Sequence, residues 1–98
     1  MNFPSKWLIA TNGTKYASAA VEYAGRLAAE LNKKPKVTIL VVANTEDTED
    51  VALGIVEMAK FLFEEEAQHK VNPDLVVKIG EPGFTITQTA KELECDHI

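Results

Sequence analysis

The stretch from residue 7 to residue 31 constrains the fold of this chain more than any other part of it. A short apolar strand ending at Ala10 runs through the polar loop Thr11-Asn12-Gly13-Thr14 directly into a regular amphipathic helix, for which we predict Thr14 as the N-cap. This layout aims backbone N–H groups at one point, which suits a phosphate or another anion. The stretch therefore predicts a βα unit with a ligand-facing loop, and the alternative is a well-capped turn without a ligand.

The apolar residues of the predicted helix follow the i, i+3, i+4, i+7 spacing that defines one buried stripe. Its members are Ala17, Ala20, Val21, Ala24, Leu27, Ala28 and Leu31, and Asn32 ends the helix. The next segment, residues 37–42, is rich in β-branched residues and apolar at nearly every position. Such a strand is typical of a parallel sheet that is covered on both faces.

The remainder of the chain repeats this alternation. A second helix is predicted from Val51 to about Gln68, after the acidic segment 43–50, with Ile55, Ala59, Leu62 and Phe63 on one face. A strand over residues 75–79, a turn at Gly80-Glu81-Pro82-Gly83 and a helix with Ile86, Ala90 and Leu93 facing inward follow. Asp96-His97-Ile98 predicts the opening of a fourth strand.

The order βαβαβα with short connections requires right-handed crossovers onto a mostly parallel sheet. We therefore predict an α/β fold of the doubly wound class with helices on both faces. Residues 1–98 form one domain in this prediction, because no internal repeat, low-complexity tract or long linker divides them.

The net charge of −5 argues against a nucleic-acid partner, because such binding depends on clustered Lys and Arg. The one basic run, Lys33-Lys34-Pro35-Lys36, is interpreted as a solvated connection after a helix whose last carbonyls attract cations. No apolar run approaches the roughly 18 to 20 residues that a membrane span needs, and MNFPSK lacks the core of a secretory signal. We therefore expect a cytoplasmic protein without a membrane partner.

Catalytic and metal-binding patterns are not recognisable in the sequence. Cys95 is the single cysteine, which excludes an internal disulfide, and no basic neighbour lowers its pKa, so we interpret it as a small buried filler. His69 and His97 lack metal-ligand spacing, and no paired carboxylates or Ser/His/Asp order favours a hydrolase. We expect no enzyme activity, no catalytic residue and no metal.

Several segments together resemble the universal stress protein family. The opening Leu8-Ile9-Ala10-Thr11-Asn12-Gly13-Thr14 is similar to the family's hydrophobic strand followed by Ala-Thr-Asp-Gly-Ser. Further similar segments are residues 20–24, 36–42, 80–82, 90–92 and 95–98. Their order and spacing cover essentially the whole chain.

The resemblance implies a non-enzymatic stress-response module, commonly a homodimer, with strand order 3-2-1-4-5 and adenosine held near the ends of the first two strands. The implied nucleotide contacts are Ala10, Thr11 and Asn12 after the first strand, with Val42 against the adenine. Gly13 and Thr14 complete that loop. Gly80 could flank the site, although the turn alone explains its presence. The implied ligand is ATP or AMP.

Two departures from the family pattern change this expectation. Asn12 stands where the family has Asp, which removes a carboxylate but keeps an amide acceptor. The glycine-rich phosphate loop after the fourth strand, its helix and the fifth strand are missing, so we expect an incomplete domain that binds ATP or AMP weakly. A ligand at the switch between strands one and four needs loops from both sides. The exposed first strand is expected to favour self-association, by strand pairing or exchange of elements.

Two other classes share this fold. A flavodoxin-like, flavin-binding electron carrier is the alternative, because the loop at residues 11–14 faintly resembles a hydroxyl-rich phosphate loop, although Trp7 precedes the strand instead of following it. A phosphoacceptor receiver domain is set aside, because Lys78-Ile79-Gly80 and Thr11-Asn12-Gly13 stand where its carboxylates belong.

Overall fold

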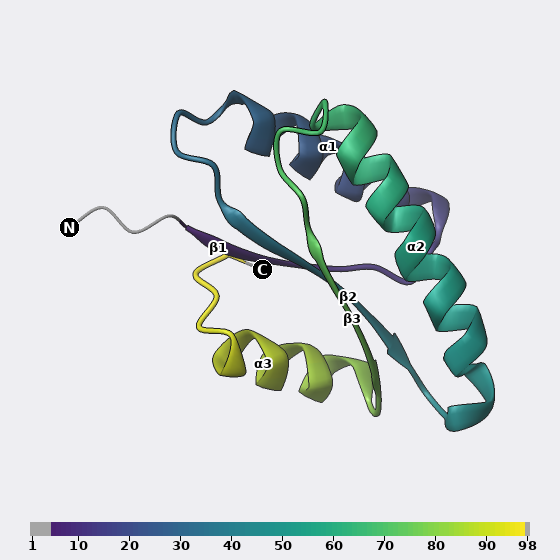
Figure 1. Cartoon of the computed structure of the whole chain (residues 1–98). Coiled ribbons are helices and arrows are strands. Elements are labelled where there is room, and N and C mark those ends of the chain that lie inside the picture. The colour runs from purple at the N-terminus through teal and green to yellow at the C-terminus, as the bar shows by residue number, and fades with distance from the viewer. Residues whose placement is uncertain (1–4, 98) are drawn as a thin grey trace.

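The computed structural model describes residues 5–97, so that residues 1–4 of the N-terminal segment and Ile98 of the predicted fourth strand lie outside the described residues. Strands and helices alternate along the chain (Figure 1). In order they are β1 (Lys6–Ala10), α1 (Lys15–Glu30), β2 (Lys36–Ala43), the 3₁₀ turn η1 (Glu46–Thr48), α2 (Glu49–Glu66), β3 (Asp74–Ile79) and α3 (Pro82–Glu92). The predicted order is confirmed, and η1 within the acidic segment is an addition to it.

The sheet is parallel, with β2 between β1 and β3. Residues Lys6 and Ala10 of β1 stand opposite Lys36 and Leu40, and β2 continues to the pair Ala43 and Ile79. β2 is buried along nearly its whole length, as its apolar run predicts. The order β1-β2-β3 agrees with the 3-2-1 part of the expected topology.

Residues 96 and 97 lie beside the outer edge of β1. Leu8 N donates to His97 O at 2.8 Å, Asp96 N donates to Lys6 O at 2.9 Å, and Trp7 forms a single parallel bridge with His97. The predicted position of a fourth strand next to β1 is therefore confirmed, although among the described residues it amounts to one bridge.

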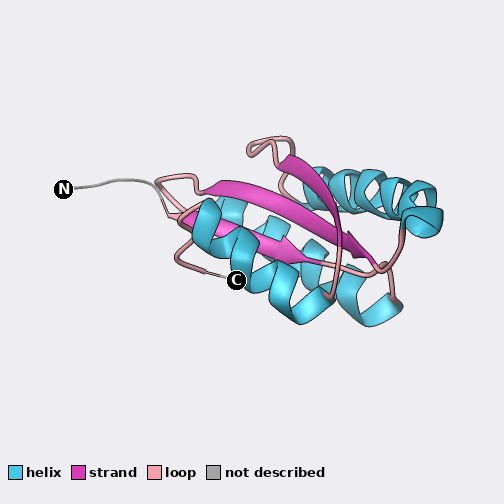
Figure 2. Ribbon diagram, turned by 90° about the horizontal axis from the view of Figure 1, so that it is seen from below, coloured by secondary structure: helices cyan, strands magenta, loops and turns pink. Residues whose placement is uncertain are grey.

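Helices cover both faces of the sheet, as predicted. α1 and α2 lie on one face and α3 lies alone on the other (Figures 1 and 2). The larger core lies on the α1 and α2 face and includes Ile39, Val41 and Phe63. The smaller one, under α3, has the buried residues Leu8, Leu40 and Ala90. Alternate residues of β2 thus enter different cores, because side chains of a strand point to opposite faces.

The stripe predicted on α1 is wrong at Ala20, which is exposed, and at Leu27 and Leu31, which are 39% and 41% exposed. α1 packs chiefly on α2 and buries Val21, Gly25 and Ala28. A Cβ at Gly25 would lie 2.7 Å from the Phe63 carbonyl oxygen, so glycine lets the two helices approach closely. Periodicity identified the apolar side of α1, but the position of α2 decides which part of it is buried.

Both ends of α1 are stabilised by nearby side chains. Thr14 Oγ1 accepts a hydrogen bond from Ala17 N at 3.2 Å, which confirms the predicted N-cap. Lys34 Nζ donates to the carbonyls of Ala29 and Leu31 after the helix ends at Glu30. The basic connection was predicted to follow helix carbonyls that attract cations, and its Lys34 binds two of these carbonyls.

The predicted turn at residues 80–83 is in fact the beginning of α3. Glu81 is the N-cap, Pro82 occupies the first turn and Gly83 is helical. Proline suits this position because its missing N–H would be unpaired there anyway. The inner side of α3 also differs from the prediction: Thr85 and Thr89 are buried beside Ala90, whereas Leu93 is 38% exposed.

Candidate functional site

A pocket of about 280 Å³ lies at the carboxyl ends of β1 and β2, between the first loop and the start of α3. In open α/β sheets this edge is where ligands bind. Its lining residues are Ala10, Thr11, Asn12, Thr14, Ala17, Leu40, Val42, Pro82 and Ile86. The structure thus brings together five residues that the sequence placed in the site: Ala10, Thr11, Asn12, Thr14 and Val42.

Hydrogen bonds within the loop hold its shape. Thr11 Oγ1 accepts from Gly13 N at 3.3 Å, and Asn12 Oδ1 accepts from Thr14 N at 3.1 Å. The Thr11 backbone N–H donates to Leu40 O at 3.0 Å, and Thr11 is buried. An anion at this helix terminus would therefore compete with the loop's own side chains for several N–H groups. The amide of Asn12 provides the acceptor that this turn needs.

The two predicted glycines do not line this pocket. Gly13 has a φ of 80°, and a Cβ there would lie 3.0 Å from Ile55 Cγ1, so its α-carbon faces α2. Gly80 lies after β3, where a Cβ would come within 2.6 Å of Thr85 Oγ1. Both glycines permit close packing at the ends of strands, and neither is placed to contact a ligand in this pocket.

Four lining residues were absent from the predicted site: Ala17, Leu40, Pro82 and Ile86. Pro82 and Ile86 come from α3, which forms the wall opposite the first loop. Their signal in the sequence was the position of Pro82 just after a strand, at the same edge of the sheet as Asn12. The turn interpretation of residues 80–83 obscured that signal.

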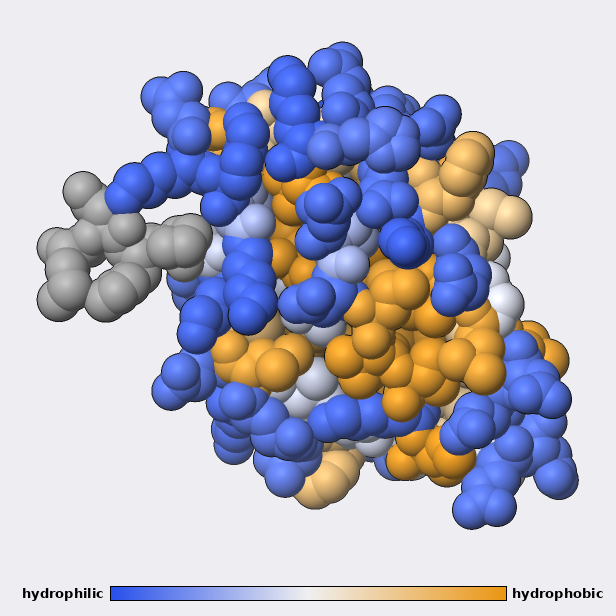
Figure 3. Space-filling view, viewed as in Figure 1, coloured by the Kyte–Doolittle hydropathy of each residue, from blue (hydrophilic) through white to orange (hydrophobic). Residues whose placement is uncertain are grey.

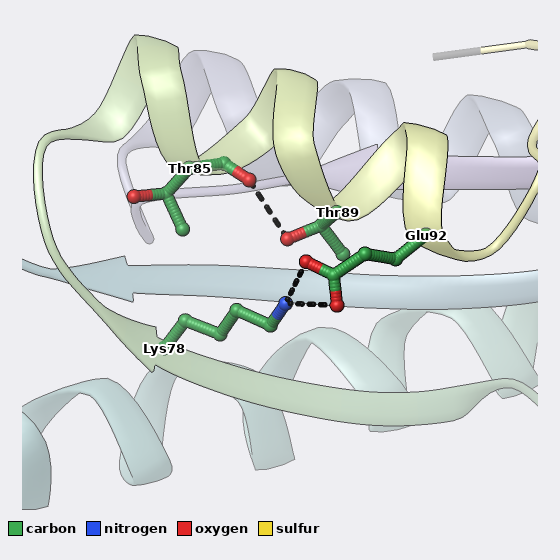
Figure 4. A network of polar contacts seen from close by, with 4 residues as sticks. All are labelled: Lys78, Thr85, Thr89 and Glu92. Atoms are coloured by element: carbon green, nitrogen blue, oxygen red, sulfur yellow. Dashed lines mark hydrogen bonds and ion pairs between the residues drawn. The ribbon is translucent and has the colours of Figure 1, made fainter.

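Polar contacts fix α3 against the sheet (Figure 4). Lys78 Nζ donates to both carboxylate oxygens of Glu92 at 3.2 and 3.3 Å, which links β3 to the last turn of α3. Thr89 Oγ1 donates to the Thr85 carbonyl at 2.7 Å, and Thr89 is 1% exposed. The inner side of α3 thus satisfies its buried hydroxyl within the helix itself.

Glu81 occupies the N-terminus of α3 next to the pocket. Its carboxylate accepts from Phe84 N at 2.6 Å and from Gly83 N at 3.0 Å. These backbone hydrogen bonds, that from Phe84 first, hold the pKa of Glu81 below its ordinary value. The anion-binding end of α3 is therefore filled by the chain's own carboxylate, and the pocket lining itself carries no ionisable side chain.

The other candidate groups lie away from this pocket. Cys95 is partly buried against the smaller core, and burial and the nearby Asp96 raise its pKa while Lys6 lowers it. Within residues 5–97, no three His, Cys, Asp or Glu side chains gather where they could hold a metal ion. No helix in that range is both long and apolar enough to traverse a bilayer.

Fold and pocket together define an open, doubly wound α/β domain with a neutral pocket at the edge where this class binds ligands. The chain belongs to the universal stress protein family, whose model matches residues 5–98. This membership sets the flavodoxin-like alternative aside. No curated protein sequence matches the chain.

Two solved structures share the fold. One, a crystal structure of a universal stress protein in complex with cAMP, has a TM-score of 0.80 and 18% identity, and covers 97% of this chain and 70% of that chain. The other, protein Rv1636 from Mycobacterium tuberculosis H37Rv, has a TM-score of 0.70 and 18% identity, and covers 99% of this chain and 70% of that chain.

Proposed function

We propose that this chain is a non-enzymatic, cytoplasmic stress-response module that binds an adenine nucleoside or nucleotide weakly and acts through self-association. The observation that carries the ligand half of the proposal is the convergence of Ala10, Thr11, Asn12, Thr14 and Val42 on one pocket. The cAMP complex of a structural neighbour supports a nucleotide as the ligand. The lack of an ionisable side chain in the pocket lining supports binding without catalysis.

The pocket chemistry favours the adenosine part of a nucleotide. Val42 and Ile86 offer apolar surface to a base above the fully buried Leu40, and Thr11 and Asn12 offer polar groups to a ribose. The volume of about 280 Å³ lies just below the usual range of about 300 to 1,000 Å³ for small-molecule sites. Because Glu81 and the loop side chains already occupy N–H groups at both helix termini, added phosphates gain little there. ATP should therefore bind no more tightly than AMP or adenosine.

Calorimetric titration with adenosine, AMP, cAMP and ATP tests this proposal. We expect dissociation constants that differ by less than about tenfold across the four ligands, that is, by less than 1.4 kcal/mol. Val42→Phe should fill the pocket and weaken binding of every ligand at least about tenfold. Val51→Phe is the matched control, because Val51 is 63% exposed on α2 and outside this pocket. Absence of binding by all four ligands at millimolar concentration contradicts the ligand half of the proposal.

Self-association is supported by the outer edge of β3, which pairs with no other strand within residues 5–97. An edge strand presents backbone N–H and C=O groups that can pair with another chain. Light scattering across a concentration series should show a molar mass that rises from about one to about two chains. A constant monomer mass at every concentration contradicts this half of the proposal.

A further inference from the structure

The backbone of β3 is open along one side. Gly80 N donates to Ala43 O at 2.9 Å, so the even-numbered residues of this strand bond to β2. The odd-numbered residues Leu75, Val77 and Ile79 consequently direct their N–H and C=O groups away from β2. Within residues 5–97, β3 pairs with no strand on that side. A strand of six residues is thus available for pairing along its length.

This edge is also apolar. In Figure 1, β3 is the strand nearest the viewer, and Figure 3, from the same side, shows hydrophobic surface across the middle of the molecule, over β3 and beside α2. Leu75, Val76 and Val77 are each partly exposed, and Ile79 is 42% exposed. Exposed apolar residues gathered around an unpaired strand edge are typical of an interaction surface.

Two charges interrupt this apolar edge symmetrically. Asp74 lies two residues before Val76 and Lys78 two residues after it, and all three belong to the sheet face that α3 covers. Lys78 also pairs with Glu92 inside the chain, but an ammonium has three N–H donors and can hold a second carboxylate. The strand is therefore complementary in charge to an antiparallel copy of itself.

We propose that β3 is the self-association site of this chain and that it pairs antiparallel with β3 of a second copy, with Val76 on the two-fold axis. This register places Asp74 opposite Lys78 of the other copy, twice. Leu75 and Val77 then form the hydrogen-bonded pairs, because their backbone groups already face outward. Asp74, Val76 and Lys78 form the non-hydrogen-bonded pairs, where side chains lie closest. An isologous contact of this kind closes as a dimer with one continuous six-stranded sheet.

The proposal gives the partner and register of the self-association proposed above, and it rests on that function. The edge of β3 is the better candidate because the other edge, at β1, is already bonded to residues 96 and 97. α3 packs mainly on β2, which leaves the outer side of β3 accessible on that face.

Cysteine cross-linking tests the register. In a Cys95→Ser background, Val76→Cys places two thiols opposite each other in a non-hydrogen-bonded pair, about 4.5 Å apart at Cα, which a disulfide spans. Val77→Cys is the matched control, because residue 77 is displaced from its own copy by two positions, roughly 8 Å. Mild oxidation of the dimer should cross-link Val76→Cys at least about tenfold faster than Val77→Cys.

Charge exchange provides a second test. Asp74→Lys sets Lys opposite Lys78 at both ends of the interface and should weaken the dimer by about tenfold, whereas the double variant Asp74→Lys with Lys78→Asp should recover most of that loss. A monomer at all concentrations refutes self-association itself, and with it the proposed function. Another result refutes the β3 register but not self-association: the protein forms a dimer that Asp74→Lys does not weaken, and that cross-links fastest through Val77→Cys or through neither cysteine.

Discussion

The two faces of the sheet are built differently. Within residues 5–97, the face under α1 and α2 contains twelve buried hydrophobic core residues, Phe63 among them, whereas the α3 face contains three, Leu8, Leu40 and Ala90. α3 compensates with buried threonines and an ion pair to β3. The pocket opens beside α3, at the margin of the smaller core. The comparison indicates that the first face supplies most of the stability and that the second supplies the site.

Truncation of the largest buried side chain on each face tests this difference most strongly. Phe63→Ala should lower the free energy of unfolding by about 3 to 5 kcal/mol, because a fully buried ring leaves a cavity among many neighbours. Leu40→Ala on the α3 face should cost less, about 2 to 3 kcal/mol. Urea denaturation followed by circular dichroism measures both.

Phe61→Ala is the control for that experiment, since Phe61 lies on the same helix but is 58% exposed, and its loss should stay below about 1 kcal/mol. Equal losses of unfolding free energy for Phe63→Ala and Leu40→Ala would contradict the proposed difference in stability between the two faces.

Glycine replacement tests how tightly the first face is packed where α1 crosses α2. Gly25→Ala should destabilise by about 1 to 3 kcal/mol despite the better helix propensity of alanine, because its Cβ would press on the Phe63 carbonyl at 2.7 Å. Gly54→Ala in α2 meets nothing within 4 Å and should stabilise by up to about 1 kcal/mol. In thermal unfolding, the melting temperature should fall for Gly25→Ala and rise for Gly54→Ala. Shifts of the same sign would show that the two helices are not tightly packed at their crossing.

The sequence predicted what depends on local patterns. The strand at residues 37–42 followed from its apolar run, and the N-cap at Thr14 from its place before the helix. Exposure of Leu27 and Leu93 could not be predicted, because periodicity identifies an apolar side but not the neighbour that covers it. Thr85 and Thr89 were missed as inner residues of α3 because a polar side chain carries no hydrophobic signal, although a hydroxyl can bond its own helix.

The candidate site also has a part that the sequence predicted and a part that it did not. The first loop was predicted because strand, polar loop and helix are consecutive in the chain. Pro82 and Ile86 required knowledge of where α3 begins, and a Glu-Pro-Gly sequence reads equally well as a turn or as a capped helix start. The glycines at 13 and 80 were placed beside the ligand by resemblance, while the structure packs each against a side chain.

A milder effect is expected from the buried threonine of α3. Thr89→Val keeps the shape and removes the hydroxyl, while the Thr85 carbonyl retains its helical hydrogen bond, so stability should change by less than about 1 kcal/mol. Thr89→Ala also removes a packed methyl group and should cost about 1 to 2 kcal/mol. Calorimetric melting separates the two variants, and a loss well above about 1 kcal/mol for Thr89→Val would show that the hydroxyl has a partner outside the helix.

The smallest effect is expected at the exposed cap Glu81. Its pKa is lowered in the folded chain, so its contribution to stability is present above the unfolded pKa and is lost as the pH falls through the folded pKa. The melting temperature of the parent chain should exceed that of Glu81→Gln at pH 7, and the difference should vanish below the ordinary glutamate range. A difference that persists at the lowest pH would assign the effect to geometry instead of charge.

Trp7, the single tryptophan of the chain, lies against His97 with ring centroids 6.3 Å apart and nearly perpendicular planes. Its indole nitrogen is buried without a hydrogen-bond partner among the described residues. The indole is therefore a built-in optical reporter of the contact between β1 and residues 96 and 97. Release of that segment would expose the ring to water and shift its emission to longer wavelength.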